Sequence, residues 1–165
     1  MSGDPGGVDG GCARPELTIR TGGRGDLAAV VRLLADDALG AAREIVQEPV
    51  APAYLEAFDA MQAQGGNTLL VAEADGTLVG CLQLTIIPGL SRAGALRAQI
   101  EGVRVAATHR GRGIGERLIE AALDRARAAG CQLAQLTSDV SRVDAQRFYE
   151  RLGFRPTHVG FKRPL

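Results

Sequence analysis

Residues 95–115 read ALRAQIEGVRVAATHRGRGIG, and this stretch decides which fold the chain adopts. Its first part, residues 95–106, is predicted to form a long strand that contains Gly102. A glycine inside a strand often marks a bulge or a close backbone approach. The second part, residues 110–115, is a turn with three alternating glycines, directly before a helical pattern. Because glycine is unfavourable inside a helix, we expect this turn to bend sharply or to approach a ligand closely.

A strand, a glycine turn and the start of a helix together form an anion-binding site. The first N–H groups of the helix lack partners, and the helix dipole is positive there. Glycines remove the Cβ atoms that would keep a phosphate away, and Arg110 and Arg112 can add charge-assisted contacts. The P-loop pattern fails because no Lys-Ser/Thr pair follows, and the dinucleotide pattern fails because Gly115 comes one residue early. The alternative is steric, with glycines that only let the strand and helix pack tightly.

The other predicted elements place this unit in a mixed sheet. Before this unit they are a strand at 17–21, helices at 25–39 and 51–66, and a hairpin over 67–87 that turns at Asp75-Gly76. After the glycine turn come a helix from 114 that stops at Gly130, a strand at 131–138 and a helix at 141–153, which begins with a capping-box-like pair, Ser141 and Asp144. One or two final strands are expected within 154–165. The unit over 96–137 should be a right-handed parallel crossover, and the remaining pairs antiparallel. This predicts an α/β fold of the α+β type, with a mixed, mostly antiparallel central sheet flanked by about four helices.

Length and charge limit the domain organisation and the partners. The chain has 165 residues, which fits one domain over residues 15–165 after a glycine-rich, disordered leader at 1–14. The formal net charge is zero, from 19 basic and 19 acidic residues, so a strongly basic nucleic-acid footprint is absent. No run of 18 apolar residues exists, so no membrane span is expected.

The cysteines predict neither a disulfide framework nor a metal site. Cys12, Cys81 and Cys131 are odd in number and far apart, and no CxxC pair exists. Reduced thiols in a cytoplasmic protein are the simple interpretation. Cys81 and Cys131 lie within predicted strands and have no evident base partner, so a cysteine nucleophile is not expected.

Two motifs in the second half of the chain resemble those of the GNAT superfamily of acyl-coenzyme A-dependent N-acetyltransferases. The first is the R-G-x-G-x-G loop at 110–115, and the second is A-x-x-x-Y-E-x-x-G-F, which begins at Ala145 and includes Tyr149. The resemblance covers residues 16 to about 163. It implies the GNAT-like acyltransferase fold, acetyl-CoA as the acyl donor, and no metal.

The resemblance also implies how coenzyme A is bound. Backbone amides of residues 110–115 would cradle the pyrophosphate. Strand 96–105 would splay from strand 131–137, and the pantetheine arm would pair with the backbone of that first strand inside the gap. The chain departs from the family at Arg142, where many relatives carry Asn, so that contact is open. The implied coenzyme A site comprises Val103, Arg104, Val105, Arg110, Gly111, Arg112, Gly113, Ile114, Gly115, Arg142 and Tyr149.

Amine acetylation needs a group that accepts a proton from the amine and one that protonates the leaving thiolate. Tyr149 matches the tyrosine that fills the second role in many relatives; the alternative is a tyrosine whose ring only packs in the core. Glu101 is the candidate base, because period two places it on the same strand face as Val105. The alternative is a solvated or ion-paired strand residue. A backbone N–H near Val103 would stabilise the oxyanion, and Gln99 would orient a water or the substrate.

The acceptor would lie, by resemblance, between the segments 37–60 and 155–161. The first segment is acidic, which would attract a cationic amine, although a solvated helix face explains the same pattern. His158 could line this pocket, whereas His109 is expected to be exposed, and loop histidines more often have no such role. The nature of the amine is not specified by the sequence.

The sequence thus predicts an N-acetyltransferase that transfers an acetyl group from acetyl-CoA to a primary amine of a small molecule or peptide, by direct attack in a ternary complex. The first alternative is a catalytically inactive GNAT-like module that binds acyl-CoA as a sensor or interaction protein. The second, more distant alternative is another nucleotide-binding fold. The resemblance also makes a homodimer an expectation.

Overall fold

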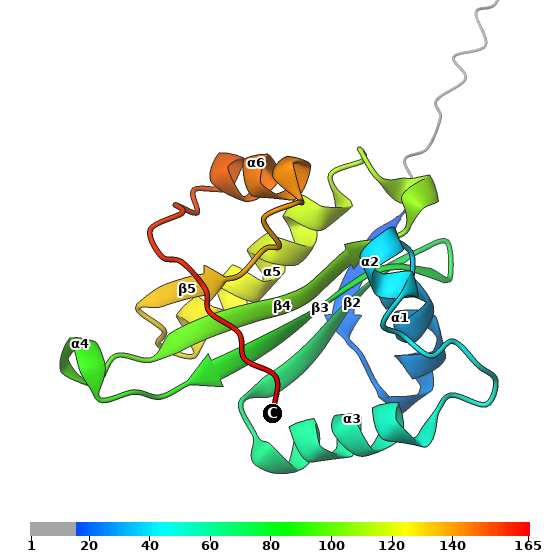
Figure 1. The fold of residues 1–165 in the computed structure, drawn as a ribbon, viewed down its shortest axis with the longest axis horizontal. Coiled ribbons are helices and arrows are strands. Elements are labelled where there is room, and N and C mark those ends of the chain that lie inside the picture. The colour runs from blue at the N-terminus through cyan, green and yellow to red at the C-terminus, as the bar shows by residue number, and fades with distance from the viewer. Residues whose placement is uncertain (1–15) are drawn as a thin grey trace, which may run out of the picture.

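A five-stranded sheet forms the centre of the computed structural model, which describes residues 16–165 (Figure 1). The leader expected at 1–14 lies outside the described residues. The strands are β1 (Leu17–Thr21), β2 (Asn67–Ala74), β3 (Thr77–Ile87), β4 (Arg97–Val105) and β5 (Leu133–Leu136), and they lie side by side in that order. Only β4 and β5 pair in parallel, and the other neighbours are antiparallel. The predicted mixed, mostly antiparallel sheet is therefore confirmed.

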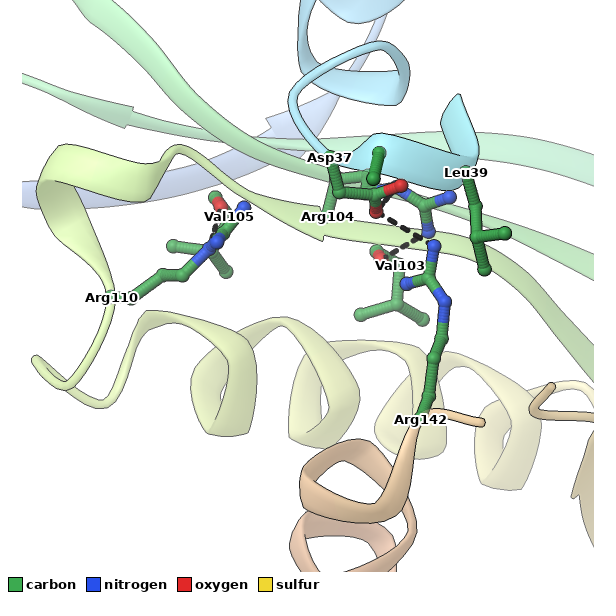
Figure 2. Close-up of a pocket in the computed structure, with 8 residues that line it drawn as sticks. Asp37, Leu39, Val103, Arg104, Val105, Arg110 and Arg142 are labelled. Atoms are coloured by element: carbon green, nitrogen blue, oxygen red, sulfur yellow. Dashed lines mark hydrogen bonds and ion pairs between the residues drawn. The ribbon is translucent and has the colours of Figure 1, made fainter. Parts of the chain in front are cut away.

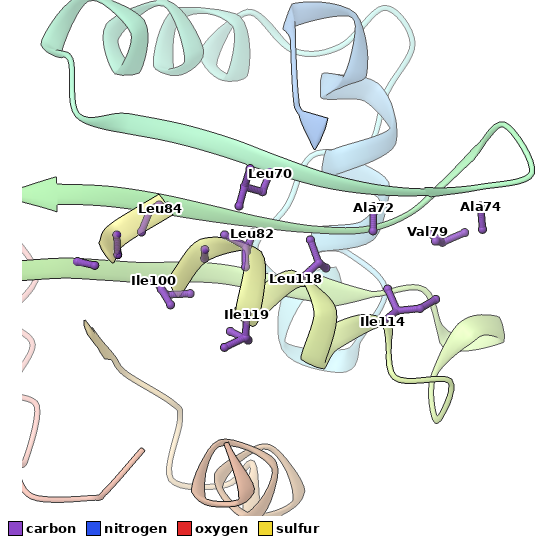
Figure 3. Close-up of a cluster of buried hydrophobic side chains, with 13 residues drawn as sticks. Leu70, Ala72, Ala74, Val79, Leu82, Leu84, Ile100, Ile114, Leu118 and Ile119 are labelled. Carbon is purple, nitrogen blue, oxygen red and sulfur yellow. The ribbon is translucent and has the colours of Figure 1, made fainter. Parts of the chain in front are cut away.

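One face of the sheet is covered by α5 (Ile114–Ala128), the helix that follows the glycine turn. Its apolar residues recur every three or four positions, which places them in one stripe against the sheet. Figure 3 shows Leu118 and Ile119 packed against Leu82 and Ile100, all almost free of solvent contact. Burial of each such side chain contributes about 1.5–3 kcal/mol, so this layer fixes the start of α5 against β4.

The opposite face is covered by α1 (Leu27–Leu34) and α3 (Pro52–Gln64). Val30 and Leu33 of α1 form a second buried cluster with Phe58 of α3, Val71 and Cys81. The short helices are α2 (Ala38–Ala41), α4 (Ser91–Gly94) and the 3-10 turns Arg24–Asp26 and Ala107–His109, and α6 (Val143–Arg151) lies near the end of the chain. Across residues 16–165, every helix is too short or too polar to span a bilayer.

The single helix expected at 25–39 is wrong, because the chain turns at Asp37. The Asp37 Oδ1 atom accepts a hydrogen bond from the Gly40 N–H at 2.7 Å, and this caps the separate helix α2. The turn is tight enough to need glycine, since a Cβ atom on Gly40 would lie 1.9 Å from the Leu34 carbonyl oxygen. The break projects the carboxylate of Asp37 toward the edge of β4.

Two expectations for the C-terminal part are also wrong. Residues 154–165 form no strand; Val159 and Phe161 stay exposed there, so no apolar face is buried that would hold a strand in place. The last helix, α6, begins at Val143 with Arg142 as its N-cap residue, without the capping box. Ser141 instead donates its backbone and hydroxyl hydrogens to Asp139 Oδ1.

Candidate active site

A β-bulge in β4 shapes the candidate site. Gln83 of β3 lies opposite Glu101, and Cys81 of β3 lies opposite Arg104. The interval is two residues on β3 and three residues on β4, so β4 contains one extra residue. Gly102 occupies the bulge with φ 61°, a left-handed conformation that glycine adopts without strain. The bulge predicted from Gly102 is confirmed.

The bulge reverses the side-chain alternation beyond Gly102. Before it, Ile100 faces α5; after it, Val103 and Val105 face α5. Glu101 therefore lies on the opposite face from Val105. The expectation that these two residues share a face is wrong, because it assumed an uninterrupted period of two.

The face that Glu101 occupies also carries the polar side chains of neighbouring strands. Gln99, two residues before Glu101, precedes the bulge and shares its face, as predicted. The Gln99 Oε1 atom accepts a hydrogen bond from Gln135 Nε2 at 2.8 Å. Gln83, opposite Glu101, donates to Asn67 Oδ1 at 3.3 Å. Glu101 thus lies among amide side chains at this end of the sheet.

The second half of β4 has an open backbone edge. β5 pairs only with Arg97 to Ile100, so within the described residues no strand continues beside β4 after the bulge. The Ala106 N–H donates to Val79 of β3 at 2.9 Å, and strand alternation therefore points the backbone groups of Val103 and Val105 away from β3. The pairing of β4 with β5 therefore ends in the region where the family resemblance implied a splay.

A cavity of about 340 Å³ lies along this open edge. α2 borders it from one face of the sheet, and the start of α6 borders it from the other (Figure 2). Side chains of the protein itself cover both edge carbonyls. Arg104 Nη1 donates to the Val103 carbonyl at 2.9 Å, and Arg110 Nε donates to the Val105 carbonyl at 3.1 Å.

The glycine turn leads from this cavity into α5. Gly111 and Gly113 have φ 75° and 76°, and Gly113 is the N-cap residue of the helix. The first N–H groups of α5 have no partner within the helix, as at any helix start. Gly115 has a steric role, because a Cβ atom there would lie 3.2 Å from the Phe148 ring of α6. The steric interpretation therefore applies to Gly115, and phosphate binding at Gly111 and Gly113 stays a prediction.

Three charged side chains from distant segments meet at the cavity (Figure 2). Asp37 Oδ2 lies 2.7 Å from Arg142 Nη2 and 3.4 Å from Arg104 Nε. Burial raises the pKa of Asp37, but the Gly40 N–H, Arg142 and Arg104 outweigh that effect and leave the pKa below its usual value. Arg142, expected near coenzyme A, therefore forms an ion pair across the open edge.

Arg110 has an acidic partner of its own next to this group. Its Nη2 atom lies 3.0 Å from the Asp36 carbonyl oxygen and 3.4 Å from Asp36 Oδ2. Asp36 Oδ2 also accepts a hydrogen bond from the Ala107 N–H at 2.7 Å. Asp36 was not predicted as a site residue, and Asp37 was expected only as one of the acidic residues of the acceptor segment 37–60. The local signal at these positions is a pair of poor helix formers at the end of an apolar helical stripe.

Tyr149 lies in α6, on the α5 side of the sheet. Its ring packs edge-on against Phe148 and Phe154, with centroid distances of 5.2 Å and 6.0 Å. Burial raises the pKa of Tyr149, and the positive charges of Arg104 and Arg142 offset only part of that rise. The phenol therefore keeps its proton at neutral pH and can act as a donor.

The remaining candidates lie apart from the cavity. His158 is exposed, whereas His109, which was expected to be exposed, is half-buried; each contacts the threonine before it in the chain. Arg112 of the glycine turn is also exposed. Burial raises the pKa of Cys81 to about 12, which makes it a poor nucleophile. Among residues 16–165, no three His, Cys, Asp or Glu side chains cluster as metal ligands.

The acidic residues of the expected acceptor segment are largely paired within the protein. Tyr54 donates its hydroxyl hydrogen to Glu44 at 2.8 Å. Glu48 pairs with Arg32 at 3.4 Å, and Asp59 pairs with Arg24. Asp37 of the same segment is held by two arginines, as described above. The segment therefore offers less negative charge to a ligand than its sequence indicates.

Comparison with known proteins gives concordant matches. A model of the acetyltransferase (GNAT) family matches residues 29–154. The curated aminoalkylphosphonate N-acetyltransferase of Salmonella typhimurium is 34% identical over 95 residues, which cover 58% of this chain and 61% of that relative. The N-alpha-acetyltransferase 30 of Saccharomyces cerevisiae is 33% identical over 46% of this chain and 42% of its own length. The chain therefore spans less than two thirds of these curated relatives.

Solved structures match over more of the chain. The crystal structure of a transcriptional regulator from Bacillus halodurans C-125 is 45% identical, with a TM-score of 0.88, and the match covers 91% of this chain and all of that one. An acetyltransferase from Trypanosoma brucei is 28% identical, with a TM-score of 0.74, and the match covers 91% of this chain and all of that one.

Proposed function

Because the chain belongs to the GNAT acetyltransferase family, we propose that it transfers an acetyl group from acetyl-CoA to a primary amine of a small molecule or peptide. The observation that carries this proposal is the open edge of β4 beyond the bulge at Gly102, directly before the glycine turn. An exposed strand edge can pair with an extended ligand, and the adjoining start of α5 can bind a phosphate.

The residues along this edge fit acetyl-CoA. The carbonyls of Val103 and Val105 accept hydrogen bonds from arginine side chains, so they are not used by the sheet and can accept from an extended arm instead. Gly111 and Gly113 leave the backbone before α5 without side-chain cover, and the first amides of the helix would hold the pyrophosphate. When bound, acetyl-CoA supplies an acetyl group activated as a thioester.

The two candidate catalytic side chains lie on opposite faces of the sheet. Glu101 faces the α1 side, where its carboxylate would accept a proton from the acceptor amine directly or through water. Tyr149 lies on the α5 side, where its hydroxyl would hold the proton needed by the departing coenzyme A sulfur. A backbone N–H near Val103 would stabilise the charge that develops on the acetyl oxygen. This arrangement supports direct attack through the gap, with the amine entering on one face and the thiol leaving on the other.

The relatives bear on the class of acceptor. The name of the Salmonella relative specifies a small amine, an aminoalkylphosphonate, and the yeast relative is named for acetylation of an α-amino group. Both acceptors are primary amines. A small-molecule amine is supported more strongly, since that relative matches more of this chain.

The test is thiol release from acetyl-CoA in the presence of a panel of primary amines. Tyr149→Phe and Glu101→Gln should each lower kcat by about 10²-fold or more, the usual contribution of a positioned acid or base. Glu120→Gln, which changes an exposed carboxylate on α5, is the matched control and should leave kcat unchanged. Turnover that survives both substitutions would show that these role assignments are wrong.

A second candidate is a module that binds acyl-CoA and regulates a partner without turnover. It is favoured by the Bacillus halodurans structure, which is described as a transcriptional regulator and is 45% identical. Calorimetry and the thiol-release assay together distinguish the two: the regulatory module would bind acetyl-CoA tightly and release no thiol with any amine of the panel. The enzyme would bind acetyl-CoA and release thiol with at least one of these amines.

A further inference from the structure

The positive charge at the cavity exceeds the negative charge. The charged residues that line it are Asp37, Arg104, Arg110 and Arg142. Arg110 pairs with Asp36, so Arg104 and Arg142 share one carboxylate, that of Asp37. One guanidinium charge therefore has no counter-ion among the residues lining the cavity.

Neighbouring carboxylates do not remove this excess. Asp139 lies close enough to Arg142 for its carboxylate to feel that positive charge. The exposed carboxylate nevertheless accepts a hydrogen bond from the Ser141 hydroxyl and forms no ion pair with an arginine in the described chain. Glu101 shares a sheet face with Arg104 and forms no ion pair with it. The positive site and the carboxylate of Glu101 are thus separate features of the same face.

The two arginines are held at the edge of β4, away from bulk solvent. Only 21% of the Arg104 side chain and 28% of the Arg142 side chain are exposed. Arg104 Nη1 donates to the Val103 carbonyl, whereas its buried Nε lies 3.4 Å from Asp37 Oδ2 and makes no hydrogen bond within residues 16–165. A partly buried, incompletely paired guanidinium attracts an anion more strongly than a solvated one.

The acyl donor does not supply this anion. The glycine turn at 110–115 would bind the pyrophosphate of coenzyme A, and the pantetheine arm and thioester that would lie along β4 are neutral. Along β4, Arg104 lies between the bulge and the turn, beside Val103 and Val105 that would hold the neutral arm. The excess charge therefore fits a group on the other substrate.

Glu101 and Arg104 are spaced to bind both ends of one small molecule. They lie opposite Gln83 and Cys81, two residues apart on β3, which corresponds to about 7 Å along the strand. We infer that the acceptor is a small zwitterionic amine, whose ammonium group lies at Glu101 and whose carboxylate, phosphonate or phosphate is bound by Arg104 and Arg142. A linker of about one to three carbons spans this distance. The inference rests on the proposed acetyltransferase function.

Matched acceptors test the inference, because they share a primary amine and differ in the charge at the other end. β-Alanine and 2-aminoethylphosphonate carry an acid, butylamine carries a neutral tail, and 1,3-diaminopropane carries a second ammonium. We expect kcat/KM for the two acids to exceed that for butylamine by at least 10-fold, with the diamine lowest. Equal values, or a preference for the diamine, would overturn the inference and leave the acetyltransferase function standing.

The variants Arg104→Met and Arg142→Met locate the effect. Each should lower the ratio of kcat/KM for β-alanine to that for butylamine by about 10-fold, and this ratio cancels any change in donor binding. Arg127→Met removes an exposed arginine from α5 and should leave the ratio as it is in the wild type. If all three variants keep the wild-type ratio of kcat/KM for β-alanine to that for butylamine, the ion pair of Arg142 with Asp37 only joins α2 to α6 and the inference is overturned. If one cavity variant does not fold, the other decides.

A binding measurement separates failure of the inference from failure of the proposed function. β-Alanine is titrated calorimetrically into the complex of the protein with coenzyme A, for the wild type and for Arg142→Met. Binding that weakens at least 10-fold in the variant supports the anion site even if no acceptor is turned over. Absence of binding to the wild type, or equal binding to both proteins, overturns it.

Discussion

Replacement of Gly102 by alanine tests whether the bulge holds β4 in its observed register. Gly102 has φ 61°, and an L-residue in this region costs roughly 1–2 kcal/mol. The new Cβ atom would lie 3.6 Å from Leu34 Cδ2, an ordinary contact, so strain is the main effect. We therefore expect Gly102→Ala to lower the free energy of unfolding by roughly 1–2 kcal/mol and Tm by about 2–8 °C.

Loss of the bulge is not a cheaper way to relieve this strain. Without the extra residue, Val103 and Val105 would turn from α5 toward α1, and Arg104 would enter the apolar layer under α5. Burial of an unpaired charge costs far more than the backbone strain. The bulge should therefore persist in Gly102→Ala, and coenzyme A should still bind to the folded variant.

Urea unfolding with linear extrapolation measures the effect. Gly94→Ala is the matched control for backbone strain without a new contact. Gly94 also has positive φ, 79°, and no described atom would lie within 4 Å of its Cβ. Gly102→Asn should be milder than Gly102→Ala, since asparagine tolerates this region better. At negative φ a Gly→Ala change normally stabilises a protein by about 0.4–1 kcal/mol, so a neutral or stabilising result at Gly102 would refute the assigned backbone conformation.

Other substitutions and a labelling experiment test the core and the ion pairs. Gly80→Ala should destabilise the protein by roughly 1–3 kcal/mol in the same urea assay, because its Cβ would lie 2.9 Å from Leu118 Cδ1 and 3.1 Å from a backbone oxygen; a neutral result would contradict the packing. Asp26→Asn should cost about 1 kcal/mol at pH 7, since hydrogen bonds from Arg20 lower the pKa of Asp26 against the effect of burial. This stability is present above the unfolded-state pKa of about 3.9 and is lost as the pH falls below it, so wild type and variant should converge in acid; a constant difference would contradict the ion pair. Cys81, which is 1% exposed and has a pKa raised to about 12, should resist a thiol reagent at pH 8 until the protein unfolds, as peptide mapping by mass spectrometry would show; rapid labelling of the native protein would contradict its burial.

Local sequence was sufficient for most elements of the fold. The turn residues Asp75-Gly76 and the apolar runs on each side predicted the β2–β3 hairpin, because both signals act within a few residues. The glycines and apolar stripe that begin α5 were predicted for the same reason. The final strands failed, because a strand needs a partner and a buried face, and residues 154–165 find neither.

The candidate site was predicted in part. Gly102 indicated a bulge, but the reversal of side-chain alternation beyond it follows only from the observed pairing with β3. The predicted face of Glu101 was therefore wrong. Arg142 was expected near coenzyme A as a departure from the family pattern, and its partner Asp37, 105 residues away in the chain, could not be found from local pattern.

What the sequence alone determined is the class of fold and the family, since the β4–turn–α5 unit is specified by local glycine, arginine and apolar spacing. Tertiary structure decided where charge gathers at the site. Asp37 leaves the end of α1, Arg104 lies beyond the bulge, and Arg142 begins α6, so their meeting depends on how three packed elements converge on one strand edge. Electrostatic interactions depend on distance in space and on burial, and neither quantity can be derived from spacing along the chain.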